Sequence, residues 1–234
     1  MRDLLSKRSE NRATYEAIIF DLDGTIVDSN ELHVAAWDEA FRHFGKHFSI
    51  DELRRQIGKG SDQYLPEFLS PDELRKLGKP IDEYRSALFR KKYLPQVKPF
   101  PKVRELFERI RANGKRIALA TSSHQDEVKT YTKLANIDGL FHCQTTADDA
   151  DESKPAPDVF RAALSKLKIS ANRAITVGDT QFDVEAGKKI GLQTIGVLCG
   201  RAADEETFRK AGAIAVFKDL ADLLTNYDTS PLAR

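Results

Sequence analysis

Short apolar runs recur along this chain, and their recurrence constrains the fold more than any other feature of the sequence. The runs are AIIF (17–20), RIALAT (116–121), AITVG (174–178), QTIGVLC (193–199) and AIAVF (213–217). Continuous apolar runs of this kind are typical of parallel strands that are buried on both faces. Because helix-like segments separate most of the runs, the sequence predicts an α/β fold with a doubly wound, Rossmann-like parallel sheet.

Helical periodicity has two distinct locations in the sequence. Four helices are expected between the strands, at 101–114, 125–137, 157–168 and 181–191. The segment 31–97 also has helix-like apolar spacing but no convincing strand, and it is far too long for a simple crossover. We therefore predict an all-helical cap domain at 31–97, inserted into a core domain formed by 1–30 and 98–234, with Lys98 and Pro99 marking the return to the core.

The composition excludes several classes of protein. Hydrophobic residues make up 41% of the chain and charged residues 31%, while the formal net charge is only +1. These values indicate a globular protein and give no electrostatic case for nucleic acid or an anionic membrane as a partner. No apolar run approaches the roughly 18 to 20 residues that span a bilayer, and the first residues lack the apolar stretch of a signal peptide. We expect a cytoplasmic location.

Two further expectations concern the polar beginning of the chain and its cysteines. Residues 1–15 are polar and charged without a strong period, which predicts an irregular arm. Cys143 and Cys199 each fall within an expected buried strand. We interpret them as small apolar packing residues and expect neither a disulfide nor a zinc site.

Four strand ends carry polar groups suited to phosphate chemistry. They are DLDGT at 21–25, TSS at 121–123, Lys154 within SKPAPD, and GDTQFD at 178–183. Each has an ordinary structural interpretation, since strand-end aspartates and threonines often cap turns or helices and a lysine before a helix is often solvated. In doubly wound sheets, however, ligands bind beyond the carboxyl ends of the strands. The recurrence of polar groups there favours a functional interpretation.

Two carboxylates lie on the turn that leaves the first expected strand. Asp21 can attack phosphorus to form an aspartyl phosphate, while Asp23 protonates the leaving oxygen and later activates water. Gly24 allows a tight turn, and Thr25 offers a hydroxyl or an amide to the phosphoryl oxygens of a substrate. This pair of carboxylates can therefore divide the labour of phosphoryl transfer.

The remaining acidic and basic groups suggest a metal and a phosphate clamp. Mg²⁺ prefers hard oxygen ligands and usually takes one or two carboxylates together with phosphate and waters. Asp21 and Asp179 can supply these from neighbouring strand ends, and Asp183 lies one helical turn further on. A cation would also relieve the clustered negative charge. Lys154 and Thr121 offer the positive charge and the donor that a transferring phosphoryl group needs.

The order of these groups resembles the four signature motifs of the haloacid-dehalogenase superfamily, over residues from about 15 to 225. The helical insertion resembles the cap of the subgroup that contains phosphoglycolate phosphatases and β-phosphoglucomutases. The resemblance implies that Asp21 is the nucleophile, Asp23 the acid/base, and Thr121 and Lys154 the phosphate clamp. It also implies that Asp179 is a metal ligand, that the backbone carbonyl of Asp23 completes the protein ligands, and that Asp183 acts as a ligand or as support.

Residues of the expected cap have divided interpretations. The similarity to sugar-phosphate enzymes implies that His33 orients the acid/base, although a partly buried structural histidine is an equally good interpretation. Trp37, one turn further on, is interpreted as core. Residues 58–61 form a break between helices, and the resemblance implies that Lys59 and Gly60 there reach the substrate. A plain interhelical turn is nearly as well supported.

Residues near the other motifs are divided in the same way. Ser122 is a candidate for substrate binding, but Ser122 or Ser123 is also expected to be a helix N-cap. His124 and Arg201 are interpreted as surface residues.

These observations predict an Mg²⁺-dependent phosphatase for a small phosphorylated metabolite, of the phosphoglycolate or sugar-phosphate type, acting as a monomer or homodimer. A β-phosphoglucomutase-like isomerase is the alternative. Those mutases carry an acidic residue before the equivalent of Asp179, where this chain has Gly178, and they lack the later aspartate. A non-catalytic binding module is a third reading, disfavoured because every motif residue is intact. Asp23 argues against carbon–halogen or phosphonate cleavage, and the chain has no Walker-type P-loop.

Overall fold

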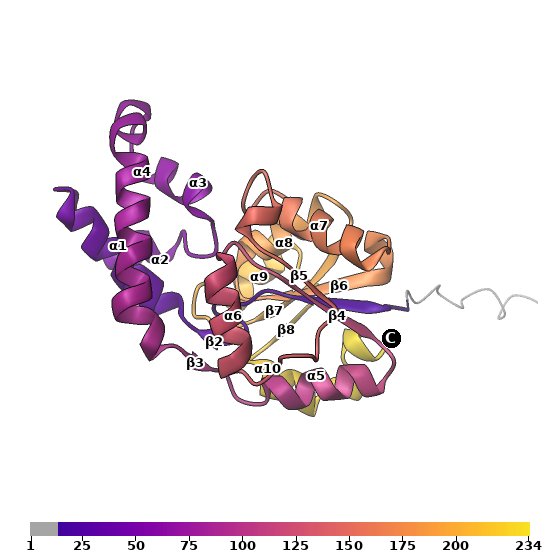
Figure 1. The fold of residues 1–234 in the computed structure, drawn as a ribbon. Coiled ribbons are helices and arrows are strands. Elements are labelled where there is room, and N and C mark those ends of the chain that lie inside the picture. The colour runs from indigo at the N-terminus through magenta and orange to yellow at the C-terminus, as the bar shows by residue number, and fades with distance from the viewer. Residues whose placement is uncertain (1–13) are drawn as a thin grey trace, which may run out of the picture.

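The computed structural model describes residues 14–234, so the predicted irregular arm at 1–15 lies almost wholly outside the described residues. A six-stranded sheet with the order β5-β4-β1-β6-β7-β8 forms the centre of the larger part of the molecule (Figure 1). All its neighbouring strands are parallel. The strands are β1 (Ala17–Phe20), β4 (Arg116–Ala120), β5 (Cys143–Thr145), β6 (Ala174–Gly178), β7 (Gln193–Val197) and β8 (Ala215–Phe217). The predicted α/β fold with a parallel, Rossmann-like sheet is confirmed.

Helices cover both faces of this sheet. Helices α5 (Val103–Ala112), α6 (Gln125–Leu134) and α10 (Leu220–Thr225) contribute to the apolar cluster on one face. Helices α7 (Asp158–Leu167) and α8 (Gln181–Lys188) contribute to the cluster on the other, and α9 (Glu205–Ala211) packs beside α8. Successive residues of β1 alternate between the clusters, with Ile18 and Phe20 on the first face and Ala17 and Ile19 on the second. This two-sided burial explains the continuous apolar runs.

Several predicted boundaries shift in the structure. The strands predicted at 116–121, 193–199 and 213–217 are shorter than their apolar runs, and β5 had no apolar run of its own because it is a three-residue strand at the sheet edge. Cys143 begins β5, but Cys199 lies beyond the end of β7. Both cysteines are half-buried rather than inside buried strands, and both pack against the sheet clusters.

The segment between β1 and β4 contains a helical unit. Its helices are α1 (Asn30–His43), α2 (Ile50–Arg54), α3 (Ser61–Tyr64) and α4 (Pro71–Leu88). Capping boxes of Ser49 with Glu52 and of Ser70 with Glu73 fix the starts of α2 and α4. The unit has its own apolar cluster, in which the Trp37 and Tyr64 rings stack 4.5 Å apart. Trp37 is thus buried as core, as the sequence indicated.

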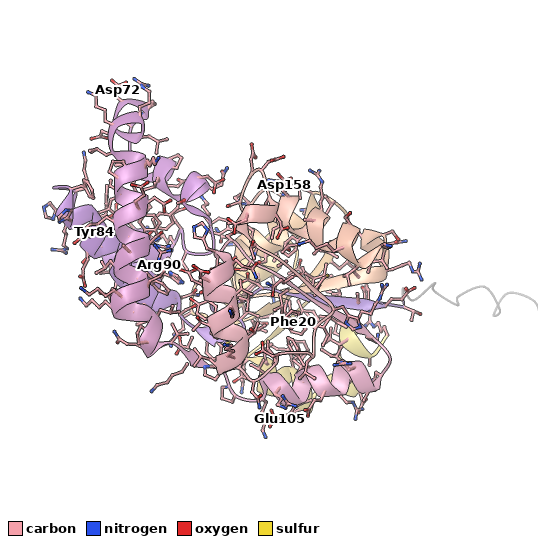
Figure 2. The ribbon with its side chains drawn as sticks, in the orientation of Figure 1. Phe20, Asp72, Tyr84, Arg90, Glu105 and Asp158 are labelled. Carbon is pink, nitrogen blue, oxygen red and sulfur yellow. The ribbon has the colours of Figure 1, made fainter. Side chains whose placement is uncertain are left out.

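A short antiparallel ladder joins the helical unit to the sheet. Strand β2 (Val27–Asp28) leads into α1, and β3 (Lys98–Pro99) leads back toward α5. Figure 2 shows one side chain from each part: Phe20 lies inside the sheet layer, and Asp72 lies at the far tip of α4. Within residues 14–234, no helix has both the length and the apolar character needed to cross a membrane.

Candidate active site

Asp21 lies at the carboxyl end of the central strand β1. Its backbone N–H donates to Val177 O of β6 at 2.9 Å, which continues the ladder and fixes the residue between two strand ends. The side chain is buried, and Lys154 Nζ donates to its Oδ1 at 2.5 Å. Burial raises the pKa of Asp21 to about 7, although the positive charge of Lys154 opposes this shift. The charged form of Asp21 therefore depends on nearby cations.

The turn after Asp21 passes close to a second strand end. Gly24 has a φ of 71°, and a Cβ atom at that position would lie 2.1 Å from Asp179 Oδ2, so the turn requires glycine. Thr25 is fully buried, and its hydroxyl donates to Asp179 Oδ1 at 3.3 Å. Thr25 was predicted to offer a hydroxyl or an amide to the phosphoryl oxygens; its hydroxyl points at Asp179, and its amide N–H donates to Leu22 O at 3.2 Å.

Three buried carboxylates converge beneath this turn. One oxygen each of Asp21, Asp179 and Asp183 lies within 4.8 Å of the others. Asp179 follows β6, and Asn30 Nδ2 holds its Oδ2 at 2.7 Å. Asp183 lies in the first turn of α8, where the N–H and hydroxyl of Thr180 both donate to its Oδ2. The cluster is therefore held by side-chain and backbone donors from three elements.

The charges of this cluster are incompletely balanced. Burial, followed by the charges of Asp21 and Asp183, raises the pKa of Asp179 well above its usual range. Lys154 is 2% exposed, and its Nζ lies 2.7 Å from Asp183 Oδ1 without the alignment of a hydrogen bond. Burial alone would lower the pKa of Lys154, but the Asp183 and Asp21 charges raise it. One ammonium among three carboxylates with hard oxygen donors fits a site for a divalent cation.

Asp23 faces the opposite side, toward a cavity. Ser29 Oγ and Ser123 Oγ donate to its two oxygens at 2.6 and 2.5 Å, and His33 Nε2 lies 2.9 Å from Oδ1. Burial would raise the pKa of Asp23, but His33 and the hydrogen bonds from His33, Ser123 and Ser29 outweigh burial and hold the pKa far below its usual range. Neither Ser122 nor Ser123 caps α6 as expected, because the N-cap residue is His124.

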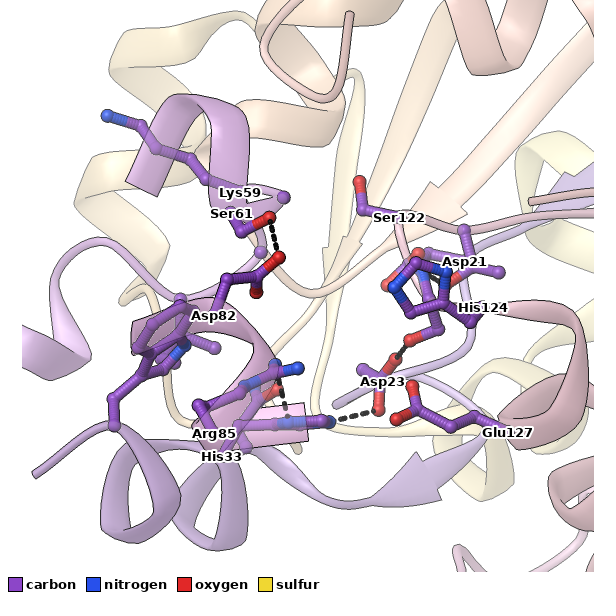
Figure 3. Close-up of a pocket in the computed structure, with 17 residues that line it drawn as sticks. Asp21, Asp23, His33, Lys59, Ser61, Asp82, Arg85, Ser122, His124 and Glu127 are labelled. Atoms are coloured by element: carbon purple, nitrogen blue, oxygen red, sulfur yellow. Dashed lines mark hydrogen bonds and ion pairs between the residues drawn. The ribbon is translucent and has the colours of Figure 1, made fainter. Parts of the chain in front are cut away.

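His33 is itself held from two sides. Arg85 Nη2 lies 3.1 Å from His33 Nδ1, and the Phe89 ring stacks on the imidazole at 3.9 Å. Because a guanidinium can only donate, Nδ1 accepts and the ring hydrogen of a neutral His33 lies on Nε2, facing Asp23. Arg85 also lies over the Trp37 ring at 4.8 Å. Figure 3 shows the resulting row of Arg85, His33 and Asp23 along the cavity.

The cavity lies between the carboxyl edge of the sheet and the helical unit, and it encloses about 620 Å³ including its open mouth. Of the predicted site residues, the structure brings these to its lining: Asp21, Asp23, His33, Lys59, Gly60, Thr121 and Ser122. Thr121 Oγ1 accepts from Ser123 N at 3.0 Å, so its own hydrogen is free to donate. Ser122 Oγ is buried and has no hydrogen-bond partner among the described residues. Both hydroxyls are thus available to a ligand.

Lys59 lines the cavity, but its charge does not enter it. Its ammonium pairs with Glu67 Oε1 at 2.7 Å and lies over the Phe182 ring at 4.8 Å. Figure 3 shows the side chain extending away from the other lining residues. A surface position for His124 was expected, and its side chain is 49% exposed, yet it also reaches the cavity. Arg201 is exposed and pairs with Asp28 at 3.0 Å, as expected of a surface residue.

Sequence reasoning missed the residues that surround the motifs. Asn30, Ser29 and Arg85 bind Asp179, Asp23 and His33 respectively. Asp82 and Glu127 also line the cavity. Ser29 is the N-cap residue of α1 and Asn30 is its first residue, so their proximity to the first motif was a usable signal. Asp82, Arg85 and Glu127 lie in charged helices, where nothing in the sequence separates them from solvated neighbours.

The fold and this site together define an α/β protein with buried carboxylates at its strand ends, three of which could hold a metal ion. The sequence profile described as "Haloacid dehalogenase-like hydrolase" matches residues 18–197, and the chain belongs to this family. The prediction of the family is thereby confirmed.

Curated relatives and solved structures narrow the class further. The chain is 34% identical over 182 residues to the pyrophosphatase PpaX of Bacillus velezensis, covering 77% of this chain and 82% of the relative. It is 27% identical to a phosphorylated carbohydrates phosphatase of Thermotoga maritima, covering 87% and 94%. It is 30% identical to a phosphoglycolate phosphatase of Aquifex aeolicus, covering 78% and 84%. A hydrolase from Pseudomonas syringae superposes with a TM-score of 0.81 at 28% identity, covering 92% and 98%. The protein is a phosphate hydrolase similar to phosphoglycolate phosphatases.

Proposed function

We propose that this protein is an Mg²⁺-dependent phosphatase that hydrolyses a small phosphate monoester through a phosphorylated Asp21. The observation that carries this proposal is the convergence at one sheet edge of a buried carboxylate bound to Lys154, an acidic cluster beside it and a second carboxylate facing the cavity. The named relatives act on pyrophosphate, phosphorylated carbohydrates and phosphoglycolate, which share a small phosphate group.

In the first half-reaction an oxygen of Asp21 attacks phosphorus, and the bond from phosphorus to the leaving oxygen breaks. Asp23 gives its proton to that oxygen, so the products are an aspartyl phosphate, a free alcohol and the Asp23 carboxylate. In the second half-reaction Asp23 takes a proton from water, the resulting hydroxide attacks phosphorus, and Asp21 is released as a carboxylate. The donors from His33, Ser29 and Ser123 favour the carboxylate that this second step requires, and the proton that Asp23 takes from water here is the one it gives to the leaving oxygen of the next substrate.

Other residues hold the phosphoryl group in place. Lys154 neutralises Asp21 and lies where charge develops on the phosphoryl oxygens, while Thr121 and Ser122 offer free hydroxyls from the neighbouring strand end. Mg²⁺ would be held by Asp21, Asp179 and the backbone carbonyl of Asp23, with Asp183 as a further ligand or as support. The bound ion would supply positive charge to the phosphoryl oxygens.

One observation favours hydrolysis over the mutase alternative. The Cβ of any larger residue at position 178 would lie 2.4 Å from Asp183 Cγ. The acidic residue that the mutases carry there is therefore incompatible with Asp183 in this chain. A binding module is disfavoured because the motif residues gather at one edge of the sheet, where Asp21, Asp23 and Thr121 line the cavity. We further propose that the helical unit is a cap domain over residues 31–97, and that the enzyme is cytoplasmic and works as a monomer or homodimer.

The test is continuous release of inorganic phosphate from p-nitrophenyl phosphate and glucose 1-phosphate in Mg²⁺, with the formation of glucose 6-phosphate followed in parallel. A phosphatase releases phosphate without a sugar bisphosphate primer. A ratio of glucose 6-phosphate to phosphate well above one would show that the enzyme is an isomerase and not a phosphatase. A folded protein that is inactive on both esters would contradict both the phosphatase and the isomerase assignment.

A further inference from the structure

Two sides of the cavity carry polar side chains that the proposed reaction does not use, the helical unit on one side and helix α6, which packs on the sheet, on the other. They are Ser61 on α3, Asp82 on α4 and Glu127 on α6. We propose that Asp82 and Glu127 form a hydroxyl-binding subsite that selects an uncharged, polyhydroxylated leaving group, so that the preferred substrates are sugar or polyol monophosphates. This inference rests on the proposed phosphatase function and names the substrate class of the same site.

Asp82 presents an incompletely bound carboxylate to the cavity. Ser61 Oγ donates to its Oδ2 at 3.0 Å, and no lysine, arginine or histidine among residues 14–234 forms an ion pair with it. Figure 3 shows Asp82 and Ser61 joined on the side of the cavity that faces Asp21 and Asp23. A half-buried carboxylate with free lone pairs is an acceptor for ligand hydroxyls.

Glu127 supplies the second, independent observation. Its residue is only 2% exposed, it lines the cavity, and in the described part of the chain its carboxylate has neither a hydrogen bond nor an ion pair. A buried carboxylate without donors is costly, so a donor from a ligand or from solvent must reach it inside the cavity. Figure 3 shows it beside Asp23. Two carboxylates from different helices therefore face the space where the leaving group would lie.

The sign of the charge around this space decides which class of leaving group can bind. Arg85 is the guanidinium that lines the cavity, and it is already bound to His33, while the Lys59 ammonium is paired with Glu67 outside. A carboxylate or a second phosphate would thus meet two acidic side chains and a single engaged cation. Hydroxyl groups can donate to both carboxylates without this repulsion. These two acidic side chains therefore disfavour phosphoglycolate and pyrophosphate.

The experiment compares kcat/KM in Mg²⁺ for glucose 6-phosphate, glycerol 3-phosphate, phosphoglycolate, pyrophosphate and p-nitrophenyl phosphate. The wild-type enzyme should prefer the two hydroxylated esters over phosphoglycolate and pyrophosphate by at least about tenfold, because unmatched polar groups in a binding site discriminate strongly. Asp82→Asn and Glu127→Gln should each reduce kcat/KM for glucose 6-phosphate about tenfold more than for p-nitrophenyl phosphate. Asp82→Lys should improve phosphoglycolate relative to glucose 6-phosphate.

Glu83→Gln is the matched control, because it removes the same charge from the neighbouring, exposed position of α4. It should leave all five values unchanged. Wild-type preference for phosphoglycolate or pyrophosphate, or equal effects of Asp82→Asn on every ester, would overturn the subsite. A failure of the subsite can be distinguished from a failure of the proposed function. Calorimetric Kd values for glucose 6-phosphate and phosphoglycolate, measured with the Asp21→Asn protein, show which ester the cavity selects without any turnover. Equal Kd values for these two esters would also overturn the proposed subsite.

Discussion

The two walls of the active-site cavity are built in different ways. On the sheet side Asp21 lines the cavity and Asp179 and Asp183 lie buried beside it, and every one contacts a side chain that is distant in sequence. On the helical side Asp82 and Arg85 are only half-buried and have few partners. Groups fixed by several neighbours hold reacting atoms in place, whereas groups with spare hydrogen-bonding capacity can adapt to a ligand.

This contrast assigns separate tasks to the walls. Changes on the sheet side should abolish the chemistry for every substrate. Changes on the helical side should alter which substrate is used and how well it is held. The predictions below test this division, beginning with the largest expected effect.

Asp21→Asn should abolish turnover, because an amide cannot attack phosphorus and offers the cation no charge. We expect kcat to fall by at least about four orders of magnitude for all phosphate esters, by analogy with the loss of other catalytic nucleophiles. The measurement is phosphate release, with circular dichroism to establish that the protein is folded. A folded Asp21→Asn protein with more than a few per cent of wild-type activity would refute the nucleophile assignment.

Asp23→Ala should slow both leaving-group protonation and breakdown of the aspartyl phosphate, by roughly two to four orders of magnitude. The loss should be greater for glucose 6-phosphate than for p-nitrophenyl phosphate, because nitrophenolate leaves without a proton. Steady-state kinetics with both substrates give the comparison. A loss below about tenfold on glucose 6-phosphate would show that Asp23 is not the general acid.

Removal of the metal should affect both activity and stability. Activity should vanish in excess chelator, and Ca²⁺ should inhibit because it takes more oxygen ligands in a looser shell. Mg²⁺ at a hundredfold excess over its Kd should stabilise the wild type by about 2.7 kcal/mol. That corresponds to a rise in Tm of roughly 5 to 10 °C for a chain of this size. Asp179→Asn should show little of this rise, and full activity in chelator would contradict the assignment.

The stabilisation by Mg²⁺ should also depend on pH. Burial raises the pKa of Asp21 to about 7 and that of Asp179 above its usual range, so the metal-free folded state holds protons that the unfolded chain releases above pH 4 or so. Without metal, stability therefore falls as the pH rises through about 7. The gain in Tm from Mg²⁺, measured by differential scanning calorimetry, should be larger at pH 8 than at pH 5. An equal gain at both pH values would contradict this cause.

The sequence predicted the sheet wall much better than the helical wall, for a physical reason. A strand buried on both faces must be apolar throughout, so polar residues at its end, such as Asp21 and Asp179, are conspicuous. Asp82 and Arg85 lie on an amphipathic helix whose solvent-facing side is also charged, and only the packing of α4 on α1 decides which charges face the cavity. The ion pair between Lys59 and Glu67 could not be predicted from the sequence, because Glu67 lies eight residues away across an interhelical turn.

Arg85→Ala should lower kcat by about tenfold, since His33 would lose the donor that fixes its tautomer and orientation toward Asp23. His33→Ala should cost a similar amount. If Arg85 acts through His33, the double variant should be no slower than His33→Ala alone, whereas independent effects would multiply. The double-mutant cycle in kcat with glucose 6-phosphate decides between these outcomes. Arg90→Ala, on the exposed surface beyond α4, is the control and should leave kcat unchanged.

The smallest expected effect concerns the contact that holds the helical wall against the sheet wall. Ser153 N–H, next to Lys154, donates to Asp62 Oδ2 of α3 at 3.0 Å. A single hydrogen bond of this kind contributes about 1 kcal/mol. Asp62→Ala should therefore shift the equilibrium between closed and open cavity by roughly fivefold, given that 1.4 kcal/mol corresponds to a factor of ten.

That shift should appear as a rise in KM of two- to fivefold, with kcat within about twofold of the wild type, because the groups on the sheet wall remain in place. Asp72→Ala is the matched control, since Asp72 pairs with Arg75 at the far tip of α4 and should change neither constant. A lower kcat with unchanged KM in Asp62→Ala would mean that the contact supports the chemistry rather than closure. The division of tasks between the two walls would then fail at Ser153, where the loop carrying Lys154 meets the helical unit.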